Sequence, residues 1–172
     1  RQQLFGQRKS FFVDQKVVVV GGGDSALQEA LHLADYASEI TIVTRGTNLR
    51  ARQSYVTRAA ENPKFSFRWE TTVAEIVGNN GVEGVRLVSA GGGDPEDFEC
   101  TGVFVFVGLA ANDGFLPSDI ERDENGFVKT DTTFATALDG VYAVGAVRSE
   151  YSGQLASAAG EAATVIAGLP AT

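Results

Sequence analysis

Several residue types are scarce in this 172-residue sequence, which lacks methionine and has one cysteine, Cys100, and one histidine, His32. A single thiol excludes an internal disulfide, a CxxC redox pair and a multi-cysteine metal site within these residues. No apolar run approaches the roughly 18–20 residues that span a bilayer, and the first residues lack a signal-peptide pattern. We therefore expect a cytoplasmic protein without a membrane partner. Because no initiator methionine is present, we also expect a piece of a longer chain.

The sequence has fewer basic than acidic residues. Lys and Arg number 14 against 22 Asp and Glu, a net charge of -8. This balance removes the electrostatic attraction on which sequence-independent nucleic-acid binding depends, so we expect no nucleic-acid partner. The 44% hydrophobic content is nevertheless enough for a packed core, in one ordinary domain or two small ones.

A β-α-β unit is the strongest structural signal. Residues 16–20 form a short β-branched run that ends in three glycines, as in a strand buried on both faces. Apolar residues then recur at helical spacing over residues 25–38, and residues 39–44 return to a β-branched run. Ser25 and Gln28 have the spacing of a capping box. The order predicts parallel strands joined by a right-handed crossover helix.

The remaining pattern predicts a second amphipathic helix over residues 51–61, which Pro63 ends. Short strands follow, and we interpret them as an antiparallel appendage to the parallel core. Near the end of the chain two more strands and an Ala/Gly-rich helix are predicted. The predicted strands are residues 65–69, 71–77, 82–89, 98–107, 127–130 and 141–144, and the last helix is residues 154–167.

The glycine-rich turn between the first strand and helix is the most specific motif. It fits G-x-G-x-x-A, the fingerprint of a dinucleotide pyrophosphate site at a helix N-terminus. The first glycine permits a tight turn, the third lets a phosphate approach the backbone, and the alanine allows close helix–strand packing. The acidic residue of the motif has an alternative role as a helix cap. The predicted contacts are Gly21, Gly22, Gly23, Asp24, Ser25 and Ala26.

The end of the second strand distinguishes the two nicotinamide cofactors. An acid there accepts a hydrogen bond from the 2′-OH of NAD, whereas arginines pair with the 2′-phosphate of NADP. The strand ends in Thr44, Arg45 and Gly46 without an acid, and Arg50 follows. NADP(H) is therefore favoured over NAD(H). The alternatives are that the two arginines are solvated loop charges or that NADH is preferred despite them.

These motifs resemble a known family. VVVVGGGDSA at residues 17–26 and EITIVTRGTNLRA at 39–51 are similar to the NADPH domain of low-molecular-weight thioredoxin reductases and their flavoprotein relatives. At the family's HRRxxxR motif, Arg45 and Arg50 match two arginines, Thr44 stands for the histidine and Gly46 replaces the other arginine. GVFVFVGLAAN (102–112), DENGFVKTD (123–131) and GVYAVGAVRSEYSGQLASAAGEAA (140–163) extend the resemblance to the C-terminal FAD motif.

The resemblance implies an α/β fold and three segments. These are a linker at residues 1–10, a Rossmann-like three-layer NAD(P)H-binding domain with the antiparallel appendage at 11–110, and at 111–172 part of a discontinuous, Rossmann-like FAD-binding domain. It implies hydride transfer from NADPH to FAD, and a homodimer for the full-length protein. The further cofactor-binding residues that it implies are Gly108, Gly145, Ala146, Gln154 and Leu155.

Three departures from the family are visible. The segment from Phe5 to Phe12, which matches the family's CxxC region, has no cysteine; Ala146 stands where the family has an aspartate; and the first, GxGxxG-containing FAD segment is absent. We expect an electron acceptor other than a dithiol of this chain: a ferredoxin, a flavodoxin, a small molecule or a partner protein. The alternative is a non-catalytic nucleotide-binding module. Residues 1–172 alone should bind little FAD and be inactive.

The remaining candidates are interpreted as structural. We expect Cys100 to be an inert thiol in a strand and His32 an ordinary surface residue. Trp69, like Phe65 and Phe67, should belong to the core. Arg52 and Arg58 should be helix surface, Gly91–Gly93 a hairpin turn, and Glu29 an exposed helix residue.

Overall fold

The computed structural model describes residues 9–169, which divide between Val107 and Gly108 into two compact units. We call them the N-terminal unit and the C-terminal unit. Most of the predicted linker at residues 1–10 lies outside the described residues; its last two residues begin a short 3-10 helix, η1 (Lys9–Phe12). The domain boundary predicted at residues 110/111 stays a prediction.

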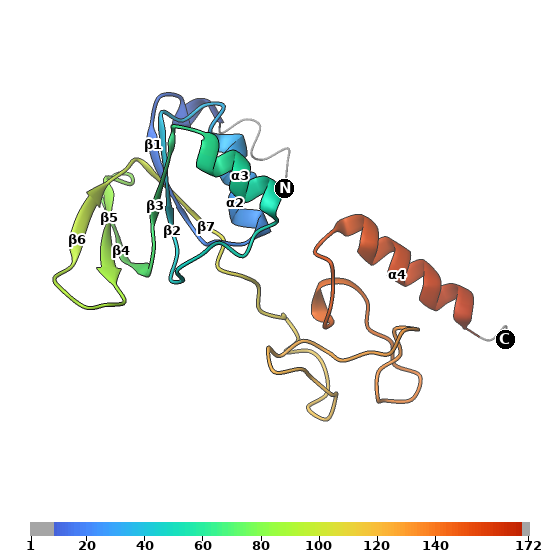
Figure 1. The fold of residues 1–172 in the computed structure, drawn as a ribbon. Coiled ribbons are helices and arrows are strands. Elements are labelled where there is room, and N and C mark those ends of the chain that lie inside the picture. The colour runs from blue at the N-terminus through green and yellow to red at the C-terminus, as the bar shows by residue number, and fades with distance from the viewer. Residues whose placement is uncertain (1–8, 170–172) are drawn as a thin grey trace. The chain divides into compact units, whose positions relative to one another are not determined.

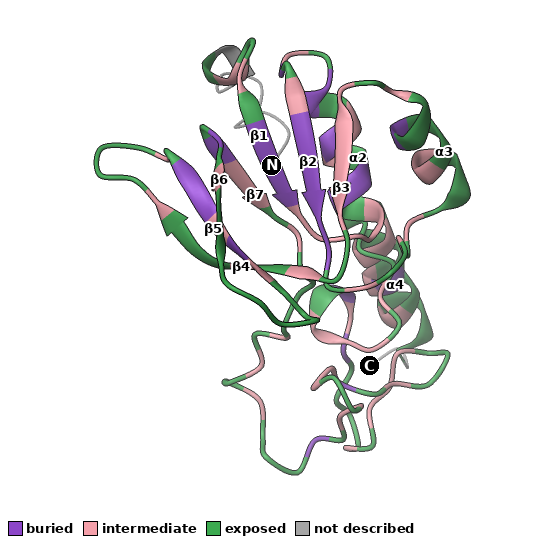
Figure 2. Ribbon diagram, turned by 60° about the vertical axis from the view of Figure 1, so that its left-hand side comes forward, coloured by how far each residue is buried: buried purple, intermediate pink, exposed green. Residues whose placement is uncertain are grey.

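A four-stranded parallel sheet forms the centre of the N-terminal unit. It consists of β1 (Lys16–Val20), β2 (Glu39–Val43), β3 (Phe65–Arg68) and β7 (Gly102–Val105) in the order β3-β2-β1-β7. β-Branched side chains pack well on a pleated surface, and those of the two central strands are almost all buried, as the purple of β1 and β2 in Figure 2 shows. In parallel strands the carboxyl ends share one edge, so the residues that follow β1 and β2 lie together.

One layer packs on each face of this sheet. Helices α2 (Asp24–Leu33) and α3 (Gln53–Glu61) cover one face, and the antiparallel sheet of β4 (Thr71–Val77), β5 (Gly84–Ser89) and β6 (Glu96–Glu99) lies on the other, as Figure 1 shows. Leu27, Ile40 and Ile42 belong to the helix-side core, and Val18, Val43 and Val85 to the other. The predicted three-layer α/β fold is confirmed.

Two strand predictions are wrong in detail. The run over residues 98–107 is not one strand: Glu96–Glu99 pairs antiparallel to β5, whereas Gly102–Val105 pairs parallel to β1. The break at Cys100 and Thr101 lets the chain change sheets. Similarly, β3 belongs to the parallel sheet and not to the appendage, because Ile40 and Ile42 pair with Phe65 and Phe67. Hydrophobicity alone does not record which partner a strand pairs with.

The start of α2 also differs from the prediction. Gly23 is the N-cap residue, no side chain caps the first turn, and the expected capping box of Ser25 and Gln28 does not form. The helix ends at Leu33, five residues early. A turn continues to Ala37, whose N–H donates to the carbonyl oxygen of Leu33.

The C-terminal unit has little regular structure. It contains the 3-10 turn η2 (Gly145–Val147) and helix α4 (Leu155–Gly168), which confirms the last predicted helix within one residue. Its small core comprises Ile120, Val128 and Ala143. The strands predicted at 127–130 and 141–144 are wrong, because within the described residues they form only isolated bridges, such as that of Val128 with Arg148.

Candidate nucleotide-binding site

The first glycine of the turn is required by its surroundings. Gly21 has φ +132°, and a Cβ atom there would lie 2.3 Å from the carbonyl oxygen of Phe106. The N–H of Gly21 donates to the carbonyl oxygen of Val43 (2.9 Å), so the turn is attached to the end of β2 as well. Any larger residue would displace this backbone, and the turn that precedes α2 depends on glycine here.

Backbone hydrogen bonds attach the loop after β2 to the glycine turn. The N–H groups of Arg50 and Ala51 both donate to the carbonyl oxygen of Gly22, at 2.7 and 3.1 Å. Thr44 is buried, and its Oγ1 would lie 3.2 Å from a Cβ on Gly22. The predicted residues Gly22, Thr44 and Arg50, separated by up to 28 positions in sequence, are therefore brought together.

The start of α2 is open to a ligand. A Cβ on Gly23 would have no protein atom within 4 Å, and the first intrahelical bond from this residue runs from the Leu27 N–H to the Gly23 carbonyl oxygen. Ala26 is buried, as its packing role requires, whereas Ser25 is exposed. Uncapped N–H groups and the positive end of the helix dipole suit an anion, so these residues fit a pyrophosphate.

Two arginines belong to the loop that follows β2. Arg45 and Arg50 are both exposed, and no hydrogen bond or ion pair is found for either side chain within residues 9–169. Gly46, between them, has ordinary backbone geometry, and a Cβ there would meet nothing closer than 3.6 Å. Guanidinium groups in this state are available to a phosphate, and they pair with it in a bidentate manner.

An ion pair that the sequence did not reveal joins the two helices. Arg52, expected to be only helix surface, donates from its backbone N–H to Asp24 Oδ1 (2.7 Å) and from Nε to Asp24 Oδ2 (2.8 Å). The carboxylate thus binds α3 instead of capping α2. The two residues lie 28 positions apart, and arginine is not a usual N-cap residue, so no local signal pointed to the pair.

The residues expected to hold FAD lie in the C-terminal unit. Gly145 has φ +73° and a buried backbone, whereas Ala146, Gln154 and Leu155 are exposed, Leu155 to 86%. Leu155 is the first residue of α4, which begins without a side-chain cap. The open helix start fits a negatively charged ring edge, but the methyl group of Ala146 offers no acceptor to a ribityl hydroxyl. The fit to FAD is therefore partial.

A buried carboxylate supports this segment. Glu161 accepts a hydrogen bond from the Gly145 N–H (2.7 Å) and one from Arg148 Nη2 (2.6 Å), and the latter also forms an ion pair with it. The hydrogen bond from Arg148, followed by the Gly145 N–H, lowers the pKa of Glu161 against the effect of desolvation. Glu161 thereby fixes η2 to α4, a role that no motif in the sequence indicates.

The remaining residues singled out in the sequence lie apart from the glycine turn in sequence. Gly108 has φ +109° and is exposed at the boundary between the units. Cys100 is buried but lies between β6 and β7, not in a strand, and burial raises the pKa of its thiol. Trp69 is not core: it is 40% exposed and stacks on Phe67. His32 is exposed, as expected, with the Asp35 carboxylate 3.8 Å away.

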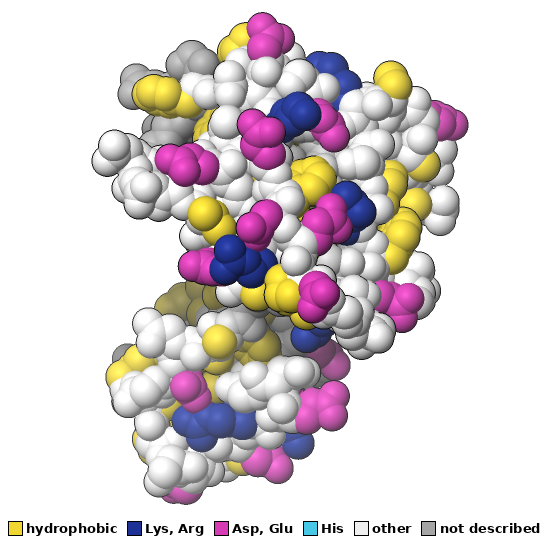
Figure 3. All heavy atoms as spheres, turned by 90° about the vertical axis from the view of Figure 1, so that its left-hand side faces the viewer, with side chains coloured by type: hydrophobic (Ala, Val, Ile, Leu, Met, Phe, Trp, Pro, Cys, Tyr) yellow, Lys and Arg dark blue, Asp and Glu magenta, His cyan; other side chains and the backbone are white. Residues whose placement is uncertain are grey.

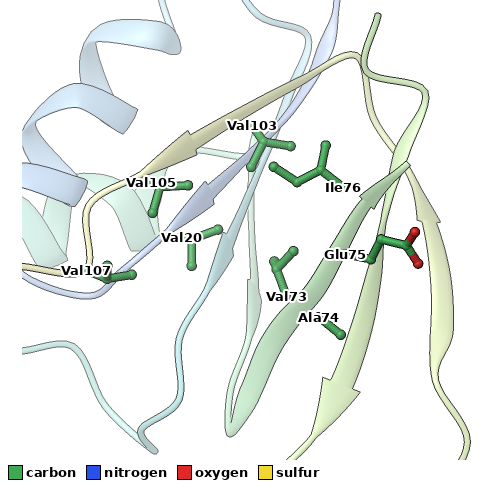
Figure 4. A pocket seen from close by; sticks show the side chains of 8 residues that line it. All are labelled: Val20, Val73, Ala74, Glu75, Ile76, Val103, Val105 and Val107. Atoms are coloured by element: carbon green, nitrogen blue, oxygen red, sulfur yellow. The ribbon is translucent and has the colours of Figure 1, made fainter. Parts of the chain in front are cut away.

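A separate apolar groove of about 260 Å³ lies between the parallel sheet and β4. Figure 4 shows valines from β1, β4 and β7 along it, with Glu75 as its single charged residue. This lining lacks the donors that a phosphate requires. On the face shown in Figure 3 acids and arginines alternate over the antiparallel sheet, where Arg86 pairs with Glu75 and Asp97.

Neither a metal site nor a membrane-spanning helix is found in the part of the chain that the structure describes. No group of three His, Cys, Asp or Glu side chains is placed to hold a metal ion. Nor is any helix there long and apolar enough to span a bilayer.

A parallel sheet and a glycine turn that opens on a helix N-terminus define a Rossmann-like α/β fold. Residues 2–163 match the model of the pyridine nucleotide-disulphide oxidoreductases, and the chain belongs to that family. The thioredoxin reductase of Listeria monocytogenes is 41% identical over 154 residues, and that of Bacillus subtilis is 36% identical over 153.

Solved structures agree with this assignment. The Lactococcus lactis thioredoxin reductase superposes with a TM-score of 0.82 at 32% identity, covering 92% of this chain and 53% of that one. The T. acidophilum thioredoxin reductase gives 0.81 at 30% identity, with 93% and 53% covered. The alignments with both curated relatives cover 88% of this chain but 48% of theirs, so the chain spans about half their length.

Proposed function

We propose that this chain is the NADPH-binding portion of a thioredoxin reductase-like flavoprotein oxidoreductase that passes hydride from NADPH to FAD without a redox dithiol of its own. The observation that carries the proposal is the attachment of Arg50 to the glycine turn through the Gly22 carbonyl oxygen. This contact holds the backbone of Arg50, whose side chain is exposed, against the turn that precedes α2. Such a site suits a cofactor that carries a pyrophosphate and a further phosphate: the helix start binds the first, and the arginine binds the second.

The residues fall into two groups by the phosphate they bind. Gly21 to Ala26 supply the turn and the backbone N–H groups for the pyrophosphate, which NADPH and NADH share. Arg45 and Arg50, with Thr44 packed against the turn, bind the 2′-phosphate, which only NADPH has. With Gly46 in place of a third cation, we expect the preference for NADPH to be real but modest.

FAD, when bound, supplies the hydride acceptor. Gly145, Ala146, Gln154 and Leu155 provide part of its site, and Gly108 lies where the two binding units meet in sequence. Loss of one hydrogen bond at Ala146 costs about 1–3 kcal/mol and does not by itself prevent flavin binding. The electron acceptor lies outside this chain, because its single thiol, on Cys100, is buried.

A non-catalytic nucleotide-binding module is the second candidate. Ala146, exposed and without an acceptor group, is the observation that favours it. The two functions predict different colours for the purified protein, because bound flavin is yellow. Protein expressed from the complete gene should be yellow and should bleach anaerobically with NADPH if it is an enzyme. A colourless protein with intact NADPH affinity would support the module instead.

The nucleotide site is tested on the 172-residue chain by isothermal titration calorimetry with NADPH and NADH. Arg50→Ala should weaken NADPH binding about 10-fold, because a charge-assisted contact contributes roughly 1.5–3 kcal/mol when well formed. NADH affinity should not change. Arg58→Ala, on the exposed side of α3, is the matched control. Equal affinity for both nucleotides, or an Arg50→Ala variant that binds NADPH normally, would contradict the assignment.

A further inference from the structure

Asp24 places a negative charge at the site where a pyrophosphate is expected. It is the first residue of α2, directly after Gly23, and its side chain is 40% exposed. An acid in the first turn ordinarily stabilises a helix through the dipole or by capping, but no side chain caps this turn. An unpaired carboxylate here would repel the phosphates that the glycine turn accommodates.

Arg52 pairs with that charge. Its backbone N–H donates to Oδ1 of the carboxylate (2.7 Å), and its Nε donates to Oδ2 (2.8 Å). Its Nη1 and Nη2 have no hydrogen-bond partner within residues 9–169, and the side chain is 72% exposed. Two guanidinium nitrogens, with four N–H donors, therefore remain for a ligand.

Folding gains little from this contact. Exposed ion pairs contribute about 0–1 kcal/mol, since water screens them and two side chains must be ordered. Its position distinguishes it from an exposed pair such as Arg86 with Asp97, which lies on the antiparallel sheet, far along the chain from the motif. The Asp24–Arg52 pair joins the first turn of α2 to the N-cap residue of α3.

We propose that Arg52 binds the cofactor pyrophosphate: it neutralises Asp24 and offers its remaining guanidinium donors to the phosphates. This inference rests on the proposed function, because it presumes that a dinucleotide binds at the glycine turn. The Asp24 carboxylate then acts through Arg52 and does not itself contact the cofactor. Arg45 and Arg50 select the 2′-phosphate, whereas Arg52 acts on the group that NADPH and NADH share.

The proposal predicts a pattern across four variants of the 172-residue chain, each compared with the unmodified chain by calorimetric titration with NADPH and with NADH. Arg52→Gln should weaken both nucleotides about 10-fold and by the same factor. Asp24→Asn should bind both at least as tightly as the unmodified chain. The double variant Asp24→Asn/Arg52→Gln should recover most of the loss, because no unpaired carboxylate remains. Arg58→Gln, in the same helix, should change neither affinity.

Thermal unfolding distinguishes a binding defect from a folding defect. Arg52→Gln keeps the backbone N–H bond to Asp24 and should melt within a few degrees of the Arg58→Gln control. Arg52→Lys, which keeps the charge but loses the two-point geometry, provides a second test and should bind with intermediate affinity.

Three results would overturn the inference. Arg52→Gln could bind both nucleotides normally, it could lose NADPH affinity alone, which would place Arg52 at the 2′-phosphate, or the double variant could show no recovery. Failure of the proposed function looks different. In that case the unmodified chain binds neither nucleotide, and the inference is overturned together with the function on which it rests.

Discussion

Gly21 and Phe106 approach so closely that a Cβ on Gly21 would lie 2.3 Å from the Phe106 carbonyl oxygen. The N–H of Phe106 in turn donates to the carbonyl oxygen of Val20 (2.8 Å), so the end of β7 is locked against the glycine turn. Gly23, two residues on, has no protein atom within 4 Å of such a Cβ. Two glycines of one motif are therefore needed for different reasons, the first for the fold and the second for the ligand.

Gly21→Ala should destabilise the N-terminal unit by at least about 2 kcal/mol, because a methyl group adds a clash to an unfavourable positive φ. Urea unfolding followed by the fluorescence of Trp69, the single tryptophan, measures this unit. Gly23→Ala is the control and should cost less than about 1 kcal/mol, the loss expected for a weaker N-cap residue. Equal destabilisation by the two variants would refute the distinction.

Gly46→Arg should restore the missing phosphate contact and raise NADPH affinity about 10-fold, leaving NADH affinity unchanged. The backbone at Gly46 is ordinary and a Cβ there would make only van der Waals contacts, so the substitution fits without strain. Thr47→Arg adds the same charge one position further along, at an exposed residue. A comparable gain from both variants would show general electrostatic attraction and not a specific contact.

Glu161→Ala should destabilise the C-terminal unit by about 3–5 kcal/mol, because it leaves the buried Arg148 charge without its partner. The loss should also expose the Gly145 N–H, which donates to Glu161 Oε2. Hydrogen exchange of peptides covering residues 143–149 measures this effect locally. Glu124→Ala, at an exposed loop position, should leave exchange unchanged; protection at Gly145 that survives in Glu161→Ala would contradict the proposed support.

The stability of the C-terminal unit should fall in acid. Hydrogen bonding from Arg148 lowers the pKa of Glu161 in the folded chain, and backbone hydrogen bonding from Phe127 lowers the pKa of Asp123. The unfolded chain therefore takes up protons first, so the stabilisation is complete above about pH 5 and is lost as the pH falls through roughly 4 and below. Chemical unfolding between pH 7 and pH 3 tests this, and Glu161→Gln should show a shallower dependence. An unchanged pH slope in Glu161→Gln would assign the effect elsewhere.

Cys100 should behave as a protected thiol. It is 1% exposed, and desolvation raises the pKa of its thiol, so little reactive thiolate is accessible. Ellman's reagent at pH 8 should react slowly with the native chain and rapidly and stoichiometrically in urea. Immediate reaction of the folded protein would reopen a redox role for this residue.

The sequence alone was sufficient for the β-α-β unit, the last helix and the glycine motif, because each is encoded by local periodicity and by residues with special backbone freedom. The strand at Thr71–Val77 was predicted with its observed bounds for the same reason. Alternating or continuous apolar runs report that a segment is buried, and Gly and Pro mark where it ends.

Only the tertiary structure decided the pairing of these segments. The run over residues 98–107 divides between two sheets because Phe98 pairs with Val85 and Val103 with Val18, choices made by strands distant in sequence. The hydrogen bonds of Arg50 to Gly22 and of Arg52 to Asp24 arise in the same way, since the carboxyl ends of parallel strands meet at one edge. The amino-acid sequence by itself determined which segments are buried and where a dinucleotide motif lies. The long-range backbone geometry decided which charges surround that motif, because hydrogen bonds across 28 residues leave no periodic trace in the chain.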